Sequence, residues 1–244
     1  MNHDWIVPDW PAPPRIRALI TTRTGGVSSG AFASMNLGEH VGDDAASCLE
    51  NRARLRALLP AEPLWLQQVH GNTVVEAASA APGTAADGAV ARVPEAVIGV
   101  LTADCLPVLL CDRQATTIGV AHAGWRGLAA GVIENTVEKM RIDPRHLVAY
   151  LGPAIGAGAY EVGGEVRRAF VAADASATAA FAERSPGKYL ADLYLLARQR
   201  LAKTGIMSVH GGGLCTFAES GRFFSYRRDG PTGRMASLIW METP

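Results

Sequence analysis

Short apolar runs bounded by turn-forming residues recur along the chain and predict a large number of strands. The longest run, AVIGVLTADCLPVLLC at 96–111, is interrupted by Asp104 and Pro107. We therefore expect two buried strands there rather than one membrane-spanning segment. Strands are predicted at residues 15–22, 64–69, 73–77, 96–102, 106–111, 116–122, 146–152, 207–212, 223–228 and 235–241.

Helical periodicity separates several of these strands. Asp43 and Asp44 can cap a helix that runs to Leu59 and places Cys48 and Leu55 on the same face as Leu59. Further helices are predicted at residues 126–141, where an apolar stripe recurs at helical spacing, and at 164–173 and 190–203.

The order of these elements predicts the fold class. Strands occur in groups as well as in alternation with helices, so we expect an α/β fold with a mixed sheet, or two stacked mixed β-sheets, flanked by helices. The segment 77–92 is rich in Ala, Gly and Pro and is predicted to be a surface loop. It is too short for a domain linker, which predicts a single domain over residues 1–244.

Composition narrows the functional classes. Lys plus Arg and Asp plus Glu both number 23, so the formal net charge is zero. A nucleic-acid or anionic-membrane partner is not expected without a basic excess, although a small anionic substrate remains compatible. The first fourteen residues lack the basic and apolar regions of a secretory signal. Four cysteines without a CxxC pair predict neither a disulfide scaffold nor a zinc ribbon, and we expect a cytoplasmic location.

Three segments combine a metal-ligand side chain with flexible neighbours: QQVHG, TADCLP and AHAGWRG. They carry His70, Cys105 and His122, each at or near the end of a predicted strand, where side chains from separate strands can converge. Two imidazoles and one thiolate form the three-ligand set of a catalytic zinc site, which keeps one position open for water or substrate. Local HxxxH or CxxC pairs are absent, so from the residues alone this trio is a hypothesis.

Further polar residues are candidates for binding the substrate. In AHAGWRG, a strand end is followed by Arg126, Gly127 and a helix start, which predicts a phosphate or carboxylate site at the helix amides. Arg23, Asn36 and Asp104 stand in loop-like settings and are predicted to bind substrate or phosphate if they face the same crevice. The same condition applies to the cluster SYRRDGPTGRM at 225–235.

The combined motifs resemble the laccase-domain family, once described as multicopper-polyphenol-oxidase-like and now assigned as purine nucleoside phosphorylases. The similarity runs from about residue 17 to 242. The matching pieces are TTRTGGVSSGAFASMNLGEHVGDD, QQVHGNTV, LTADCLPVLL, VAHAGWRGLAAGVI, LGPAIGAGAYEVG and CTFAESGRFFSYRRDGPTGRMASLIW.

The resemblance implies a fold, a cofactor and a reaction. Its fold is a single α/β domain with stacked β layers between helices, similar to a deamidating bacterial toxin domain. Its metal ligands match His70, Cys105 and His122, which would also be the catalytic residues, with Zn²⁺ or alternatively Cu²⁺ as the ion. The implied activities are phosphorolysis of adenosine, inosine and methylthioadenosine, with adenosine deamination alongside. The partners would be a purine nucleoside and inorganic phosphate.

Three alternatives remain open at this point. Copper-dependent phenol oxidation has been attributed to relatives, but six histidines are too few for a four-copper laccase. A dyad of Cys105 and His122 suits a metal-independent cysteine hydrolase or amidase that edits peptidoglycan precursors. A structural zinc protein would need a fourth ligand, for which Cys111 or Cys215 is available.

Overall fold

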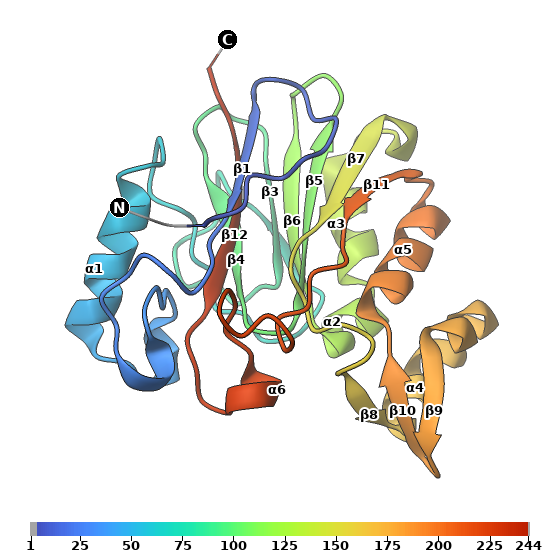
Figure 1. Ribbon diagram of the computed structural model, residues 1–244. Coiled ribbons are helices and arrows are strands. Elements are labelled where there is room, and N and C mark those ends of the chain that lie inside the picture. Colours follow the sequence, from blue (N-terminus) through green and yellow to red (C-terminus); the bar gives the residue numbers. More distant parts are fainter. Residues whose placement is uncertain (1–3, 244) are drawn as a thin grey trace.

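A mixed six-stranded sheet forms the centre of the molecule, which is a computed structural model that describes residues 4–243 (Figure 1). The strand order is β11 (Ser208–Gly211), β7 (Leu147–Leu151), β5 (Leu106–Asp112), β6 (Ile118–Ala123), β3 (Gly88–Ala91) and β2 (Val74–Glu76). The four inner strands pair antiparallel, whereas β11 and β2 at the two edges pair in parallel with their neighbours.

A second, antiparallel sheet packs on one face of the first. Its strands are β1 (Ile16–Ile20), β12 (Met235–Met241) and β4 (Ile98–Thr102), in that order. Side chains alternate along the buried strand β5, as a period of two requires. Val108 and Leu110 join the core on the helical side, while Leu109 and Cys111 join the core between the two sheets.

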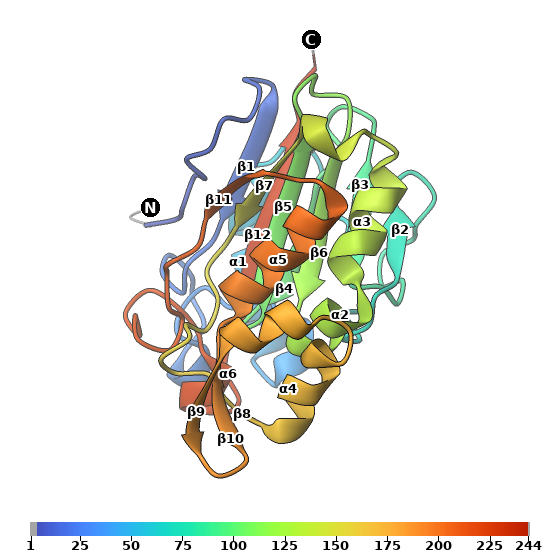
Figure 2. The ribbon, with the colours of Figure 1, turned by 90° about the vertical axis from the view of Figure 1, so that its right-hand side faces the viewer.

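Helices cover both outer faces of the stacked sheets. Helices α2 (Trp125–Ala130), α3 (Val132–Met140) and α5 (Leu193–Thr204) pack on the six-stranded sheet, as Figure 2 shows. Helix α1 (Ala45–Arg56) lies on the opposite side, where Leu55 and Leu59 pack against Leu238 of β12. The predicted α/β architecture, with two stacked sheets flanked by helices, is confirmed.

The predicted start of the first helix is also confirmed. The side chain of Asp44 accepts a hydrogen bond from the amide of Ser47 at 2.8 Å and caps α1. Cys48 and Leu55 are buried on one face of α1, but the helix ends at Arg56, before the predicted end at Leu59, and Leu59 is buried in the turn that follows.

The helix predicted at 126–141 is two helices, because Gly131 adopts φ 91° between α2 and α3. Glycine reaches this left-handed conformation without the steric cost that a Cβ brings, and it commonly ends a helix. The apolar stripe continues across the break, and for this reason the periodicity alone suggested one helix.

The segment 77–92 is wrongly predicted as a surface loop throughout, since its last part forms β3 with every residue buried. Its Gly and Ala residues serve close packing of α3 on the sheet. A Cβ on Gly88 would lie 3.1 Å from the hydroxyl of Thr136 in α3, and one on the neighbouring Gly119 would lie 3.0 Å from the methyl of Thr136. Small residues here indicate a tight helix–sheet contact, and the composition was misread as that of a loop.

Two predicted strands are wrong. Residues 223–228 form a buried Phe pair followed by the short helix α6 (Tyr226–Asp229). The hydroxyl of Ser225 accepts a hydrogen bond from the amide of Arg228, and the carboxylate of Asp104 accepts one from the amide of Arg227. These side chains provide acceptors for the free amides at the start of α6. Residues 64–69 make only isolated bridges at Leu64 and Gln67.

A small third sheet was not predicted. It contains β8 (Glu161–Gly163), β10 (Lys188–Ala191) and β9 (Phe181–Ser185), and it packs with α4 (Gly164–Val171) at one end of the molecule (Figure 1). The helix predicted at 190–203 therefore starts later, after Asp192 accepts a bond from the amide of Leu195. Four short 3₁₀ helices, Gly30–Phe32, Glu39–Val41, Pro144–His146 and Ala175–Ala180, complete the elements of the described residues.

Within residues 4–243, none of the helices has the length and apolar character needed to cross a membrane.

The turn between β5 and β6 yields a stability prediction. The buried Asp112 carboxylate accepts bonds from the amides of Gln114, Thr116 and Thr117. Asp112→Ala should lower the free energy of unfolding by about 2 kcal/mol, because it leaves turn amides without acceptors. Asp143→Ala, which removes a more exposed cap, should lower it by clearly less. Urea denaturation measures both, and equal losses would contradict the burial argument.

Candidate metal centre

The three predicted ligands converge although they come from separate segments. His70 lies in the loop before β2, Cys105 in the turn between β4 and β5, and His122 on β6. Their ligand atoms all lie within 4.8 Å of one another. The two imidazole rings are 4.8 Å apart between centroids and nearly perpendicular, at 76°. Small side-chain rotations would bring these atoms to the roughly 3.5 Å separations of a tetrahedral zinc site.

Cys105 lies where the chain passes from one sheet to the other, because β4 belongs to the three-stranded sheet and β5 to the six-stranded sheet. Asp104 holds this turn in a left-handed conformation, with φ 95°. Its carboxylate accepts a 2.6 Å bond from the hydroxyl of Thr216 and a 2.7 Å bond from the amide of Arg227. The turn is thereby fixed to the C-terminal segment of the chain.

Asp87, which no sequence motif indicated, organises both histidines. The side chain is fully buried, and its Oδ1 lies 2.8 Å from Nδ1 of His122. The same carboxylate accepts bonds from the amides of Val69, His70 and Gly71 at 3.2, 2.9 and 2.7 Å. A carboxylate partner at Nδ1 keeps the proton on that nitrogen and leaves Nε2 available as a ligand.

The glycines of AHAGWRG provide the space for the cluster. A Cβ on Gly124 would lie 2.9 Å from Sγ of Cys105 and 3.1 Å from Cδ2 of His70. A Cβ on Gly127 would lie 2.5 Å from the carbonyl oxygen of Gly71. Both positions therefore require glycine, so that α2 can approach the loop that carries His70.

The electrostatics favour a thiolate at the centre. Burial would raise the pKa of Cys105, but the charge of His122 and hydrogen bonds from both histidines outweigh it and lower the pKa to about 6. Burial would lower the pKa of His122, but the Cys105 charge and the Asp87 hydrogen bond raise it to about 9. Thiolate is the form in which cysteine binds metals or acts as a nucleophile.

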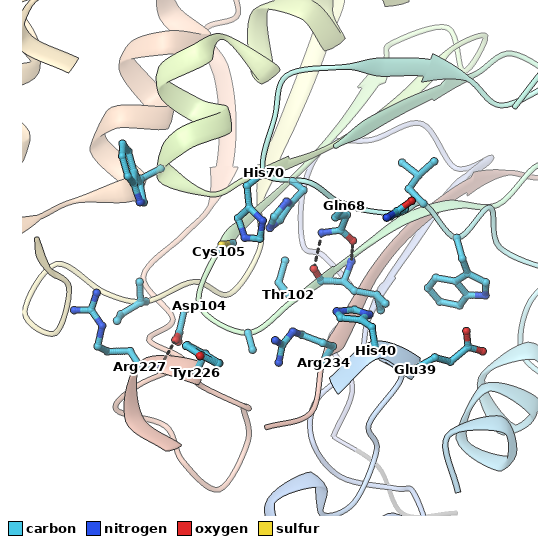
Figure 3. Close-up of a pocket in the computed structure, with 18 of the residues that line it drawn as sticks. Glu39, His40, Gln68, His70, Thr102, Asp104, Cys105, Tyr226, Arg227 and Arg234 are labelled. Carbon is cyan, nitrogen blue, oxygen red and sulfur yellow. Dashed lines mark hydrogen bonds between the residues drawn. The ribbon is translucent and has the colours of Figure 1, made fainter. Parts of the chain in front are cut away.

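The cluster opens into a cavity of about 1000 Å³, which Figure 3 shows. Its walls carry aromatic groups together with cationic and amide side chains. They include His40, Arg52, Trp65, Gln68, Asp104, Trp125, Tyr160, Tyr226, Arg227 and Arg234. Tyr226, Arg227 and Arg234 of the cluster 225–235 line this cavity, which was the condition for a role in substrate binding.

Other predicted binding residues lie differently. Arg126 is exposed, stacks over the ring of Trp125 at 4.5 Å and does not line the cavity; Gly127 is buried behind it. Arg23 donates to the carbonyls of Ala33 and Ser220, outside the cavity lining. Contact of these residues with substrate or phosphate stays a prediction.

Asn36 is fully buried and also lies outside the cavity lining. Its side chain bonds the backbone of Gly38 and Arg234 and the carboxylate of Asp43. Substrate contact by Asn36 likewise stays a prediction, whereas Asp104 does line the cavity.

Neither candidate for a fourth protein ligand joins the trio. Cys111 is buried between the two sheets, and Cys215 accepts bonds from the amides of Gly156 and Ala218. Across residues 4–243, His70, Cys105 and His122 make up the one group of His, Cys, Asp or Glu that could hold a metal. A three-ligand set open to a cavity is the arrangement of catalytic rather than structural zinc sites.

Replacement of the buried carboxylate tests its role in metal binding. Asp87→Asn should weaken zinc binding by roughly 10–100-fold, because the His122 tautomer and the 69–71 loop lose their fixed acceptor. Asp112→Asn, another buried carboxylate that accepts backbone amides, is the matched control and should leave zinc affinity unchanged. Competition with a chromophoric chelator measures both. Wild-type affinity in Asp87→Asn would refute this role.

Alkylation of the metal-free protein tests the thiolate. Iodoacetamide modification of Cys105 should increase with pH through a midpoint near 6, the pKa that the neighbouring histidines produce. Burial raises the pKa of Cys111 to about 12, so that thiol should stay unmodified. Peptide mass mapping reads each cysteine separately. A Cys105 midpoint at or above 8.5 would contradict the proposed electrostatics.

Comparison with known proteins places this geometry in a family. The model of the family described as multi-copper polyphenol oxidoreductase laccase matches residues 17–242. A Pseudomonas aeruginosa protein named purine nucleoside phosphorylase is 54% identical, with 98% of each chain covered. The purine nucleoside phosphorylase YfiH of Escherichia coli is 52% identical, covering 97% of this chain and 98% of its own.

Solved structures agree in fold. A Neisseria meningitidis protein of the family DUF152 is 50% identical and has a TM-score of 0.95, covering 98% of this chain and 100% of its own. YlmD from Geobacillus stearothermophilus is 31% identical with a TM-score of 0.88, covering 98% of this chain and 96% of its own. The chain therefore belongs to the multi-copper polyphenol oxidoreductase laccase family, the laccase-domain family that its motifs resemble.

Proposed function

We propose that the protein is a zinc-dependent purine nucleoside phosphorylase that cleaves adenosine, inosine and methylthioadenosine and deaminates adenosine as a side activity. Relatives that match nearly the whole chain are named purine nucleoside phosphorylases. The observation that carries the proposal is the cluster of His70, Cys105 and His122 beside a cavity of about 1000 Å³, which is large enough for a nucleoside and phosphate together.

The donor set fits zinc. Thiolate and imidazole are its preferred ligands, and Asp87 supports His122 from behind as a carboxylate does in many zinc sites. The proposed reactions involve no electron transfer, and zinc has no redox chemistry. Only two of the six histidines belong to the cluster, which gives no support to a multinuclear copper site.

Phosphorolysis requires few groups from the protein. A phosphate oxygen attacks C1′ of the ribose, the N-glycosidic bond breaks, and the purine leaves with the bonding electrons and gains a proton. Bound zinc supplies a Lewis acid that stabilises developing negative charge. The ring of Trp125 and the phenol of Tyr160 provide apolar surfaces for the base or sugar. Burial raises the pKa of Tyr160, so its hydroxyl stays protonated and can donate a hydrogen bond.

A second candidate is a cysteine hydrolase or amidase acting on peptidoglycan precursors. The lowered pKa of Cys105 beside His122 favours it, because a thiolate next to an imidazole is a competent nucleophile. That reaction would continue in chelator and stop in Cys105→Ser. Copper-dependent phenol oxidation would instead require oxygen consumption on addition of copper.

We also propose a cytoplasmic location. All four cysteines, Cys48, Cys105, Cys111 and Cys215, are free thiols, which suits a reducing compartment.

The decisive assay separates the two reactions on one substrate. Metal-quantified protein is incubated with adenosine, with and without phosphate, and the purine products are separated by chromatography. Phosphorolysis predicts adenine only when phosphate is present, together with one equivalent of ribose 1-phosphate. Deamination predicts inosine without phosphate, and inosine together with its phosphorolysis product hypoxanthine when phosphate is present. Adenine release independent of phosphate would contradict the phosphorylase assignment.

The same assay tests the metal ligands. His122→Ala should lose bound zinc and at least about 100-fold of the phosphorolysis rate, because the site loses one of its three ligands. His210→Ala is the matched control, since His210 contacts Ser208 and lies outside the cavity. Full phosphorolysis by metal-free His122→Ala would refute the proposed function.

A further inference from the structure

The cavity has a second chemically distinct region beside the metal centre. Arg234, His40 and Arg52 line this part of the wall, and Figure 3 shows Arg234 and His40 on the side of the cavity across from His70 and Cys105. The acidic residues that line the cavity are Glu39, which is exposed and pairs with Arg52 at 2.7 Å, and Asp104. Glu39 is thus paired with Arg52, and neither carboxylate forms an ion pair with Arg234.

Arg234 is the arginine of this region whose guanidinium has no carboxylate partner among the described residues. Its Nη1 donates to the carbonyl oxygens of Thr232 and Gly233 at 2.8 and 3.1 Å, but it forms no ion pair with any residue of the 4–243 range. Burial lowers the pKa of Arg234, and the charges of Cys105 and Asp104 offset this effect only in part. The nearby Asp104 already uses both carboxylate oxygens on Thr216 and Arg227.

The two neighbouring groups differ in what they can offer a ligand. Arg52 is engaged, since it donates to the carbonyl of Leu37 and to Glu39 and stacks over Trp65 at 4.7 Å. His40 is exposed to the cavity. Burial and the charges of Arg234 and Arg52 lower its pKa, so at neutral pH it is an uncharged donor close to Arg234.

Backbone contacts through Asn36 fix the segment that carries His40 next to the segment that carries Arg234. The buried Asn36 accepts bonds from the amides of Gly38 and Arg234, both at 2.9 Å, and so joins the segment before His40 to the strand β12 region. A Cβ on Gly38 would lie 2.8 Å from Cγ of Arg234, so only glycine lets the arginine stem pass. Asn36 thus helps to position Arg234, although Asn36 itself does not line the cavity.

We propose that Arg234, assisted by His40, forms the subsite that binds inorganic phosphate next to the metal centre. A guanidinium offers paired donors that match two phosphate oxygens, and a dianion would compensate the desolvated charge. The identity of the anion as the co-substrate rests on the proposed function. The location of the subsite is inferred only from the residues that line the cavity, and it does not depend on the proposed function.

This placement differs from the one that the sequence favoured. Arg126 is exposed over Trp125, and it belongs to the first turn of α2, a helix of only six residues. The two placements therefore predict different results for phosphate binding: loss on replacing Arg126 in one case, and loss on replacing Arg234 in the other.

Calorimetric titration of the zinc-loaded protein with inorganic phosphate at fixed ionic strength tests the subsite without turnover. Arg234→Gln should raise the Kd for phosphate on the order of tenfold or more, since a charge-assisted pair of hydrogen bonds is lost. Arg234→Lys should be intermediate, because it keeps the charge but loses the paired donors. In the assay, the KM for phosphate should rise in Arg234→Gln while the KM for adenosine changes less than threefold.

The controls separate binding from folding and from the proposed function. Arg167→Gln is matched, because Arg167 is half-buried over the Tyr189 ring and outside the cavity, and it should bind phosphate like wild type. Thermal unfolding verifies that each variant is folded. Wild-type phosphate affinity in Arg234→Gln, a loss in Arg126→Gln instead, or no phosphate binding by wild type would overturn the proposal.

Adenosine 5′-monophosphate identifies the source of the anion. If Arg234→Gln weakened binding of this nucleotide but not of inorganic phosphate, the subsite would take a phosphate group on a nucleotide, and our assignment would be overturned. Phosphate binding through Arg234 without cleavage of adenosine would support the subsite and contradict the proposed function, so the two failures are distinguishable.

Discussion

The buried carboxylate of Asp87 is the interaction on which the candidate site depends. It lies before β3, bonds His122 of β6, and accepts three successive amides from the 69–71 loop. One charged group therefore sets the ring orientation of one metal ligand and the backbone position of another. A buried carboxylate is costly unless its lone pairs are satisfied, and here four donors satisfy it. The candidate metal site and the packing of the sheet thus share one hydrogen-bond network.

The stacked sheets supply the rest of the geometry. Cys105 stands at the crossing between them, and the glycines at 124 and 127 let α2 approach without displacing the ligands. The cavity extends from this crossing toward Arg234 at the start of β12 and toward His40, which lies more than 190 residues earlier in the chain. The proposed phosphorolysis needs an activated substrate and an anion held side by side, and we assign these roles to the two ends of this cavity.

The sequence predicted the layered α/β fold and the convergence of His70, Cys105 and His122, because both leave local signals. Alternating apolar runs indicated buried strands, and each ligand lies in a distinct motif at a strand end. Asp87 left no such signal, since it stands among Ala and Gly residues whose role is close helix–sheet packing. Arg234 and Arg126 look equally basic in the sequence. Only the tertiary structure shows that one lines the cavity and the other stacks outside it.

The coordination of zinc in the wild-type protein tests the central claim most directly. X-ray absorption spectroscopy of the protein with one equivalent of zinc should show one sulfur at about 2.3 Å and two imidazole nitrogens at about 2.0–2.1 Å. A single further light atom from a non-protein ligand should complete the tetrahedron. Two sulfur ligands, or a first shell without sulfur, would contradict an active centre built from His70, Cys105 and His122.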